Sequence, residues 1–484
     1  MNMNIQNRIL FFGDNLNILE EKVPDETFDL IYLDPPFNSD RNYNVLFKEG
    51  KVDSTAQIHA FADTWEWTPQ TVKLFEELKH SQNPQIAILT ASLAEFIGQN
   101  TMMAYLVNMI ARLIPLRRVL KSTGSIYLHC DPTASHYLKI ILDIIFDKKN
   151  FRNEIIWCYR QGGRSENNFP KKHDIIFFYS KSDVWTFNAD AIRVPYEGTG
   201  GYQTSGKGVT NKITGRTYKP NPMGKIPEDW WDIPALAPMD KERLGYPTQK
   251  PEALLERIIK ASTNENDWIL DPFCGCGTTV AVAEKLHRNW MGIDISMQAI
   301  NVIAKRLKDH YQGVKINIDG IPMDYEGAAK LAQQDKFAFQ DWAISLVGAN
   351  PPSGETKKGA DRGIDGLILF YERGEDIMSP KLRKIIVQVK GGGTGRGDIA
   401  KLKGDIEREN APMGILITLE DPTPEMKRET ALAGKYQYSG NVSFPKIQML
   451  SIRDWFDGRS VYLPTDKVNP FKRAEARADQ TSLL

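Results

Sequence analysis

The stretch from Trp268 to Asp294 constrains the fold more than any other part of the chain. A short apolar run is followed by a Gly-rich turn, a helical segment and a second apolar run that ends in an acid. This order predicts two parallel strands joined by a helix, and therefore an α/β sheet covered by helices. Glycines let the main chain approach a ligand closely, and an acid at the end of the next strand can hold ribose hydroxyls. The segments are Trp268–Asp271, 272–277, Thr278–Leu286 and Trp290–Ile293.

A second motif, Asp34-Pro35-Pro36-Phe37, follows the apolar run Asp29–Leu33, which we predict to be a buried parallel strand. The motif then lies at the carboxyl end of a strand, where open α/β sheets bind their ligands. Two prolines stiffen the turn and leave carbonyls unpaired. A carboxylate, a carbonyl and an aromatic ring together suit an exocyclic amine on a planar base. An ordinary exit from strand to loop is the alternative for this motif taken alone.

These groups indicate amine methylation. The N6 amine of adenine is a poor nucleophile because its lone pair is delocalised into the ring. Hydrogen bonds from N6 to the Asp34 carboxylate and the Pro35 carbonyl would favour a pyramidal nitrogen that attacks a sulfonium methyl group. A base in a duplex must be flipped out to reach such a pocket, with Phe37 as its stacking partner. This hypothesis requires Asp34 and Gly275 to open into one shared pocket.

The two motifs together resemble the β-group of amino-DNA methyltransferases, in which the catalytic motif precedes the cofactor motif. The resemblance implies a Rossmann-like, S-adenosylmethionine-dependent methyltransferase fold that acts on double-stranded DNA. It makes Asp34 to Phe37 catalytic and gives Asp294 the ribose hydroxyls of the cofactor. Aspartate before the two prolines favours adenine N6, and cytosine N4 remains the alternative. The residues expected around the methionine part of the cofactor are Asp271, Phe273, Gly275, Gly277 and Thr278, with Asp14 as a further contact.

The resemblance extends to two flanking segments, 248–255 and 172–180, which correspond to a helix leading into the cofactor strand and to a late strand of the sheet. Ile9–Phe12 is expected to be an edge strand, and capping of the next helix is the other role open to Asp14. His129, Asp131 and His136 resemble a metal cluster, but we favour structural roles at a strand exit. Cys274 and Cys276 are interpreted as packing residues.

Three further segments are expected near DNA or the active site. Residues 38–100 form a partly helical insertion over the active site, with Trp65 and Trp67 interpreted as local core. The connection 160–165 is flexible and basic, which suits phosphate contact. Residues 185–230 are the candidate target-recognition region, because basic side chains are interleaved there with aromatic ones, and a solvated loop without a partner is the alternative. The basic residues are Arg193, Lys207, Lys212, Arg216, Lys219 and Lys225.

The pattern starts again after about Tyr325. A helix over 337–346, a strand over 367–370 and a stronger strand over 384–390 predict a second α/β domain. Gln388 and Lys390 share one face of their strand, and Asp365 could meet them there. An acid, an oxygen ligand and a lysine suit a Mg²⁺-activated water that attacks a phosphodiester. Gln340 or Asp341 would supply a further ligand, and only one of them can face the site.

This half resembles the restriction-endonuclease fold of the Mrr-like, type IV group, on its Gly-rich turn and Gln-x-Lys strand motif. Glutamine replaces the usual acid of the nuclease motif, which leaves less negative charge for a metal. A DNA-binding module that does not cut is the alternative. We therefore predict a methyltransferase domain over 1–322, a nuclease-like domain over 325–463 and a disordered tail over 464–484, serving restriction-modification or phage defence.

Composition sets wider limits. A chain of 484 residues can hold two domains, and its 61 basic and 61 acidic residues mean that a DNA surface must be a local patch. Four cysteines, no secretory leader and no long apolar run predict a cytoplasmic protein without membrane contact. Three modes of assembly stay open: a homodimer, a complex with a restriction partner subunit, and a subunit that needs its partner for activity. Methylation of RNA or protein amines also stays open.

Overall fold

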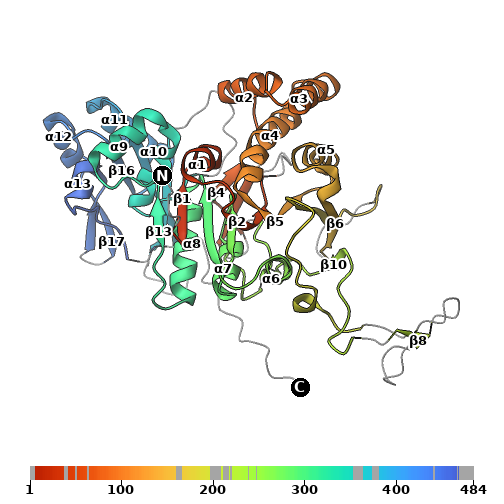
Figure 1. The fold of residues 1–484 in the computed structure, drawn as a ribbon. Coiled ribbons are helices and arrows are strands. Elements are labelled where there is room, and N and C mark those ends of the chain that lie inside the picture. Colours follow the sequence, from red (N-terminus) through yellow and green to blue (C-terminus); the bar gives the residue numbers. More distant parts are fainter. Residues whose placement is uncertain are drawn as a thin grey trace.

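The computed structural model describes most of the chain as two α/β domains joined by helices (Figure 1). The description covers the main chain alone over 42–49, 52–62, 209–210 and 217–218 and at Ser439. The described residues are 6–36, 42–49, 52–62, 65–159, 166–196, 209–210, 217–218, 221–237, 239–246, 248–352, 363–372, 381–439, 442–465 and 467.

A nine-stranded sheet forms the first domain, in the order β10-β6-β7-β5-β2-β11-β12-β1-β13. Neighbouring strands are parallel except that β7 runs antiparallel to both β5 and β6. The two motif strands, β2 and β11, are adjacent, so the carboxyl ends of both lie at one edge of the sheet. The bounds are β1 Ile9–Phe12, β2 Phe28–Leu33, β5 Leu120–Cys130, β6 Phe151–Cys158, β7 His173–Ser180, β10 Trp230–Asp232, β11 Trp268–Asp271, β12 Asn289–Asp294 and β13 Asn317–Asp319.

Helices cover both faces of this sheet. Side chains alternate between the faces of a strand, so Leu30 and Tyr32 of β2 join one core while Ile31 and Leu33 join the other. The core around Ile31 contains α1 to α5, and the core around Leu30 contains α6, α7 and α8. The bounds are α1 Asn15–Lys22, α2 Pro69–Lys79, α3 Pro84–Ile97, α4 Thr101–Val119, α5 Ser135–Phe146, α6 Glu252–Ser262, α7 Thr278–Lys285 and α8 Met297–His310.

The sequence predictions for this domain are largely confirmed, with one correction. Ile9–Phe12 is a strand, but β1 pairs with β12 on one side and with β13 on the other, so it is an inner strand. A run of four residues does not reveal whether a third strand covers its open side. The predicted insertion is partly helical, with α2 and α3, and also holds the hairpin β3 Asn42–Glu49 and β4 Val52–Ala62. Short segments complete the domain: η1 Lys148–Asn150, η2 Ala189–Ile192, β8 Val209–Thr210 and β9 Thr217–Tyr218.

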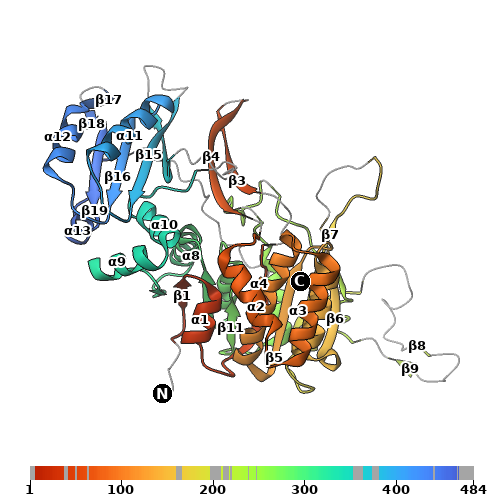
Figure 2. The same ribbon diagram turned by 90° about the horizontal axis from the view of Figure 1, so that it is seen from above.

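The second domain contains a four-stranded sheet, β14-β15-β16-β19, in which only the β14–β15 pair is antiparallel. Helix α11 packs on β15 and β16, and α10 packs on β15 as well. Figure 2 shows this sheet beside the first domain, with α10 between it and α8. The bounds are α9 Tyr325–Gln334, α10 Lys336–Leu346, β14 Gly366–Glu372, β15 Lys381–Lys390, α11 Arg396–Arg408, β16 Met413–Thr418, α12 Pro424–Leu432, β17 Lys435–Ser439, β18 Val442–Pro445, β19 Ile447–Ser451 and α13 Ile452–Phe456.

The two domains share part of their core. Ile300 of α8 and Phe339 of α10 belong to one continuous cluster of buried side chains. Asp341 Oδ2 accepts the Met297 N–H at 2.5 Å, at the first residue of α8. Asp341 therefore contacts the first domain, and the expectation that it could serve as a nuclease ligand is not supported. Within the described residues, the helices lack the length and apolar character needed to cross a bilayer.

Candidate functional site

A cavity of about 480 Å³ lies at the carboxyl ends of β1, β2, β11 and β12. Both sequence motifs contribute to its wall, so the prediction that Asp34 and Gly275 open into one pocket is confirmed. The parallel order of the sheet brings the motifs together although more than 200 residues separate them along the chain. Among the predicted site residues, the wall includes Asp14, Asp34, Pro35, Pro36, Asp271, Phe273, Gly275, Thr278 and Asp294.

The Gly-rich turn shapes one side of this cavity. Gly275 has a φ of 52°, and its N–H donates to Asp294 Oδ2 at 2.7 Å. The other oxygen of Asp294 accepts the Ser296 N–H at 2.8 Å, so the carboxylate is fixed at the end of β12. Gly277 caps α7, and a Cβ there would lie 2.7 Å from Ile303. Gly277 is therefore required by packing and does not appear in the cavity wall.

Two carboxyls in the cavity wall titrate abnormally. Burial raises the pKa of Asp271 to about 7, although hydrogen bonds from Thr279 and from the Phe273 N–H oppose the shift. Burial likewise raises the pKa of Asp294 to about 6, against hydrogen bonds from Ser296 and Gly275. Hydrogen bonds therefore offset only part of the cost of burying these two carboxylates. A cationic or hydroxyl-bearing ligand would favour the charged form of both.

Asp34 lies between two basic side chains. Its Oδ2 contacts Lys250 Nζ, and its Oδ1 is 3.9 Å from His129 Nδ1. His129 is fully buried, with Nδ1 2.9 Å from the Tyr32 hydroxyl and Nε2 3.2 Å from Asp174 Oδ2. The protein's own polar groups therefore contact both ring nitrogens of His129. Among the residues that the structure describes, no group of three His, Cys, Asp or Glu side chains could hold a metal ion.

Other expected contacts fall around the same cavity. Asp14 caps α1 through the Leu16 N–H, as expected, and its carboxylate also accepts from Arg112 at 3.0 Å. Trp65 packs against the core, but its indole N–H donates to the Pro36 carbonyl at 3.2 Å and its ring lines the cavity. Cys274 and Cys276 are buried, as their interpretation as packing residues requires.

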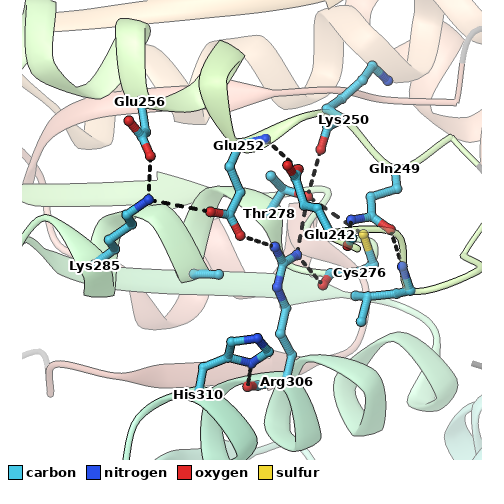
Figure 3. A network of polar contacts seen from close by, with 12 residues as sticks. Glu242, Gln249, Lys250, Glu252, Glu256, Cys276, Thr278, Lys285, Arg306 and His310 are labelled. Atoms are coloured by element: carbon cyan, nitrogen blue, oxygen red, sulfur yellow. Dashed lines mark hydrogen bonds and ion pairs between the residues drawn. The ribbon is translucent and has the colours of Figure 1, made fainter. Parts of the chain in front are cut away.

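A polar network holds the segment that carries Lys250 (Figure 3). Arg306 of α8 is 3% exposed and donates to Glu252 Oε1 at 2.8 Å, and it approaches the Cys276 carbonyl at 3.4 Å. The Glu252 N–H in turn donates to Glu242 Oε1 at 2.6 Å. Sequence reasoning identified this segment only as part of a helix leading into the cofactor strand. Its Thr248-Gln249-Lys250-Pro251 sequence was the available signal.

The nuclease-like residues lie together on and beside β15. The Asp365 N–H donates to the Val387 carbonyl at 2.9 Å, and Asp365 Oδ2 accepts the Val389 N–H at 2.6 Å. Asp365 is therefore hydrogen-bonded to the residues on both sides of Gln388. Gln388 is 1% exposed and its Nε2 donates to Asp405 Oδ2 at 2.5 Å. Within the described part of the chain, Gln388 Oε1 has no hydrogen-bond partner. Lys390 Nζ is 3.7 Å from Asp398 Oδ1.

Several predicted residues lie outside the described residues. These are Phe37, the connection 160–165, and most of the tail. In the candidate target-recognition region, the description includes Arg193, which donates to the Gly224 carbonyl at 2.9 Å, and Lys225, which pairs with Glu228. Lys207, Lys212, Arg216 and Lys219 also lie outside it.

Comparison with known proteins agrees with this arrangement. A family model described as DNA methylase matches residues 28–306, and one described as restriction endonuclease matches residues 331–437. Type II methyltransferase M1.MboII of Moraxella bovis is 36% identical over 189 residues, which are 38% of this chain and 71% of that protein. DNA adenine methyltransferase YhdJ of Escherichia coli (strain K12) is 29% identical over 315 residues, which are 64% of this chain and 86% of that protein.

Solved structures give weaker matches. PvuII DNA methyltransferase (cytosine-N4-specific) aligns with a TM-score of 0.39 and 14% identity, over 65% of this chain and 92% of that one. The DNA methylase model alone spans more than half of the 484 residues. The chain therefore belongs to the DNA methylase family, and it carries a C-terminal restriction endonuclease domain.

Proposed function

We propose that the protein transfers a methyl group from S-adenosylmethionine to the N6 amine of an adenine flipped out of duplex DNA, in restriction-modification or phage defence. The observation that carries this proposal is the single cavity walled by both Asp34-Pro35-Pro36 and the turn from Asp271 to Thr278. A donor held at the end of β11 and an amine held at the end of neighbouring β2 would face each other across this cavity.

The described residues fit this cofactor. The carboxylate of Asp294 is fixed by two main-chain N–H groups and retains lone pairs for ribose hydroxyls. Space above Gly275 extends to the Tyr246 ring, which a Cβ on Gly275 would meet only at 3.8 Å. The acids Asp271 and Asp294 provide negative potential beside a cationic ligand. When bound, the cofactor supplies an electrophilic methyl group on a positively charged sulfur.

The protein contributes positioning and electrostatics. Asp34 and the Pro35 carbonyl would accept the two N–H groups of the amine and so direct its lone pair into the cavity. The carboxylate also stabilises the positive charge that develops on the nitrogen, and it is an acceptor for the proton that the methylated amine loses. Trp65 holds the Pro36 carbonyl from outside the turn and thereby fixes the orientation of the motif.

Adenine is favoured over cytosine N4 by two arguments. Aspartate at position 34 follows the pattern of adenine enzymes in the resembling group, and the relative YhdJ is described as an adenine methyltransferase. Modified-base sequencing of DNA from cells expressing wild type or Asp34→Ala tests the proposal. N6-methyladenine at one sequence motif in wild type alone is the expected result. N4-methylcytosine instead would contradict the choice of base.

For the C-terminal domain we propose Mg²⁺-dependent cleavage of DNA, with Asp365 and Gln388 holding the ion. Mg²⁺ prefers oxygen ligands, and the buried Gln388 Oε1 is an oxygen that lacks a partner among the described residues. The ion would activate water, and Lys390 would offset charge that develops on the phosphate. Incubation of plasmid with Mg²⁺ and either wild type or Asp365→Ala tests this. Cleavage by wild type alone supports it, whereas no cleavage of methylated or unmethylated plasmid leaves a binding role.

A further inference from the structure

We propose that Lys250 is a positioning residue for Asp34 in the methyl transfer described above. Its ammonium group holds one oxygen of the catalytic carboxylate, Oδ2, and so presents the other oxygen, Oδ1, to the amine of the target base. The inference rests on the proposed function and adds a residue to it. The resemblance identified the Lys250 segment only as part of a helix leading into the cofactor strand.

The contact itself is well shielded from solvent. Lys250 Nζ contacts Asp34 Oδ2 across 216 residues of sequence, and the two side chains are 9% and 16% exposed. An ion pair at this depth is screened far less than a surface pair. Asp34 Oδ1 is 3.9 Å from the His129 ring, which is too long for a hydrogen bond. Asp34 Oδ2 is therefore paired with the Lys250 ammonium group, whereas Asp34 Oδ1 is separated from the His129 ring by more than a hydrogen-bond length.

The main chain of Lys250 is fixed independently of this ion pair. Its carbonyl accepts from Thr278 Oγ1 at 3.3 Å, on the first residue of α7. Gln249 beside it donates to the Glu242 carbonyl and accepts the Leu244 N–H, both at 2.8 Å. Figure 3 shows the Lys250 side chain extending away from the Arg306 network that anchors this segment. The Lys250 ammonium group is thus directed at Asp34 from a main chain that hydrogen bonds hold in place.

The charge around this pair explains why a cation is needed. Among the groups that face Asp34 or Lys250 electrostatically, most are acidic or neutral: Tyr32, Cys130, Asp174, Asp271 and Cys276. Without the ammonium group, an ionised Asp34 would face the neighbouring carboxyls with less compensation. It would then take up a proton more readily and would also lose the bond that fixes its orientation.

A purely structural ion pair makes a different prediction. It would affect stability or cofactor binding, but it would leave the pH dependence of the methyl-transfer rate unchanged. The pH profile therefore distinguishes a positioning role from a structural one. Charge should also matter more than shape, so arginine should replace lysine better than methionine does.

The test measures methyl transfer from labelled S-adenosylmethionine to duplex DNA by full-length wild type, Lys250→Met and Lys250→Arg. Lys260→Met is the matched control, because Lys260 pairs with Glu256 at 3.3 Å on α6 away from the cavity wall. We expect Lys250→Met to lower kcat about 10²-fold or more, as loss of an electrostatic contact does at an active site. The acidic limb of its rate profile should move to higher pH. Lys250→Arg should recover most of kcat, and Lys260→Met should match wild type.

Two results would overturn the inference. One is a Lys250→Met protein whose kcat lies within about threefold of wild type with an unchanged pH profile. The other is an equal loss in the Met and Arg variants without a change in profile. Thermal unfolding and cofactor binding are measured in parallel, and Lys250→Gln replaces Lys250→Met if the latter does not fold. A wild-type protein without methyl transfer contradicts the proposed function itself, whereas an active wild type leaves the Lys250 comparison decisive.

Discussion

In the first domain Asp34 and Asp294 line a cavity of about 480 Å³, whereas in the second domain Gln388 is 1% exposed and bonded to Asp405. The first set of groups already surrounds a space that a ligand could enter. The second set is packed between a strand and α11, with one oxygen atom lacking a partner among the described residues. The first site can therefore admit a ligand as it stands, whereas the proposed metal binding by Gln388 would require its Oε1 to become accessible.

The difference has a physical basis in topology. The first site lies at the carboxyl edge of a parallel sheet, where strand ends and loops leave a hollow. The second lies on the face of β15, where α11 covers the polar side chains. A site on a strand face is exposed only if its covering helix shifts or its side chains change rotamer.

The largest expected effect is on the rate of methyl transfer, which should depend on the first site and not on the second. Asp34→Ala should lower methyl transfer by about 10³-fold, because it removes an acceptor that stabilises developing positive charge. Its thermal unfolding is measured in parallel, because the buried Lys250 ammonium group loses its ion-pair partner in this variant. Asp365→Ala is the matched control and should leave methyl transfer at the wild-type rate. Equal methylation by Asp34→Ala and wild type would contradict the assignment of the catalytic motif.

A second variant tests how tightly the second site is closed. Gln388→Glu puts a buried carboxylate next to Asp405, so it should destabilise the protein by about 2–4 kcal/mol at pH 8 through desolvation and like-charge repulsion. The loss should shrink as pH falls to 5, since protonation of one carboxyl restores a hydrogen bond. Denaturant unfolding at both pH values measures the difference. Gln437→Glu, at an exposed position on β17, is the control.

A smaller, pH-dependent change in the free energy of unfolding is expected for Asp341 of α10, the helix that contacts both domains. Burial raises the pKa of Asp341 to about 6, against the hydrogen bond from the Met297 N–H. A raised carboxyl pKa contributes stability that is present below about pH 4 and is lost as pH rises through 6. Asp341→Asn keeps an acceptor for Met297 but does not titrate. Between pH 5 and pH 8 it should therefore gain about 1–2 kcal/mol relative to wild type.

Unfolding curves at several pH values check this prediction. Asp335→Asn is a useful comparison, because Asp335 caps α10 at an exposed position. A constant difference between Asp341→Asn and wild type across the pH range would mean that Asp341 does not titrate as its burial requires.

The smallest effect concerns Lys390. Its amine is 3.7 Å from Asp398 and both side chains are partly exposed, so Lys390→Ala should change the free energy of unfolding by less than about 0.5 kcal/mol. Methyl transfer should be unaffected. Loss of plasmid cleavage with intact stability would then assign Lys390 to chemistry. A large loss of stability would instead indicate a structural role.

Sequence reasoning found what local patterns encode. The strand that leads into Asp34 and the Gly-rich turn around Gly275 are contiguous, and the order of strands and helices indicated that both end at one edge. Lys250 and Trp65 were missed as site residues because their roles depend on where distant segments are placed. The choice between Gln340 and Asp341 stayed open for the same reason, since α10 offers two faces and the sequence does not state which domain each face meets.

The hydrogen bond from the Met297 N–H of α8 to the Asp341 carboxylate of α10 limits where such enzymes can be joined to other domains. Gln298 of α8 also donates to Asn350 at 2.8 Å, and Asn350 exchanges main-chain hydrogen bonds with Leu367 of β14. A fusion junction placed before α9 would remove these hydrogen-bond partners from the methyltransferase domain. It would also expose apolar side chains of that domain to water. Functional chimaeras with other cutting modules would have to inherit α9 and α10 together with the methylating half.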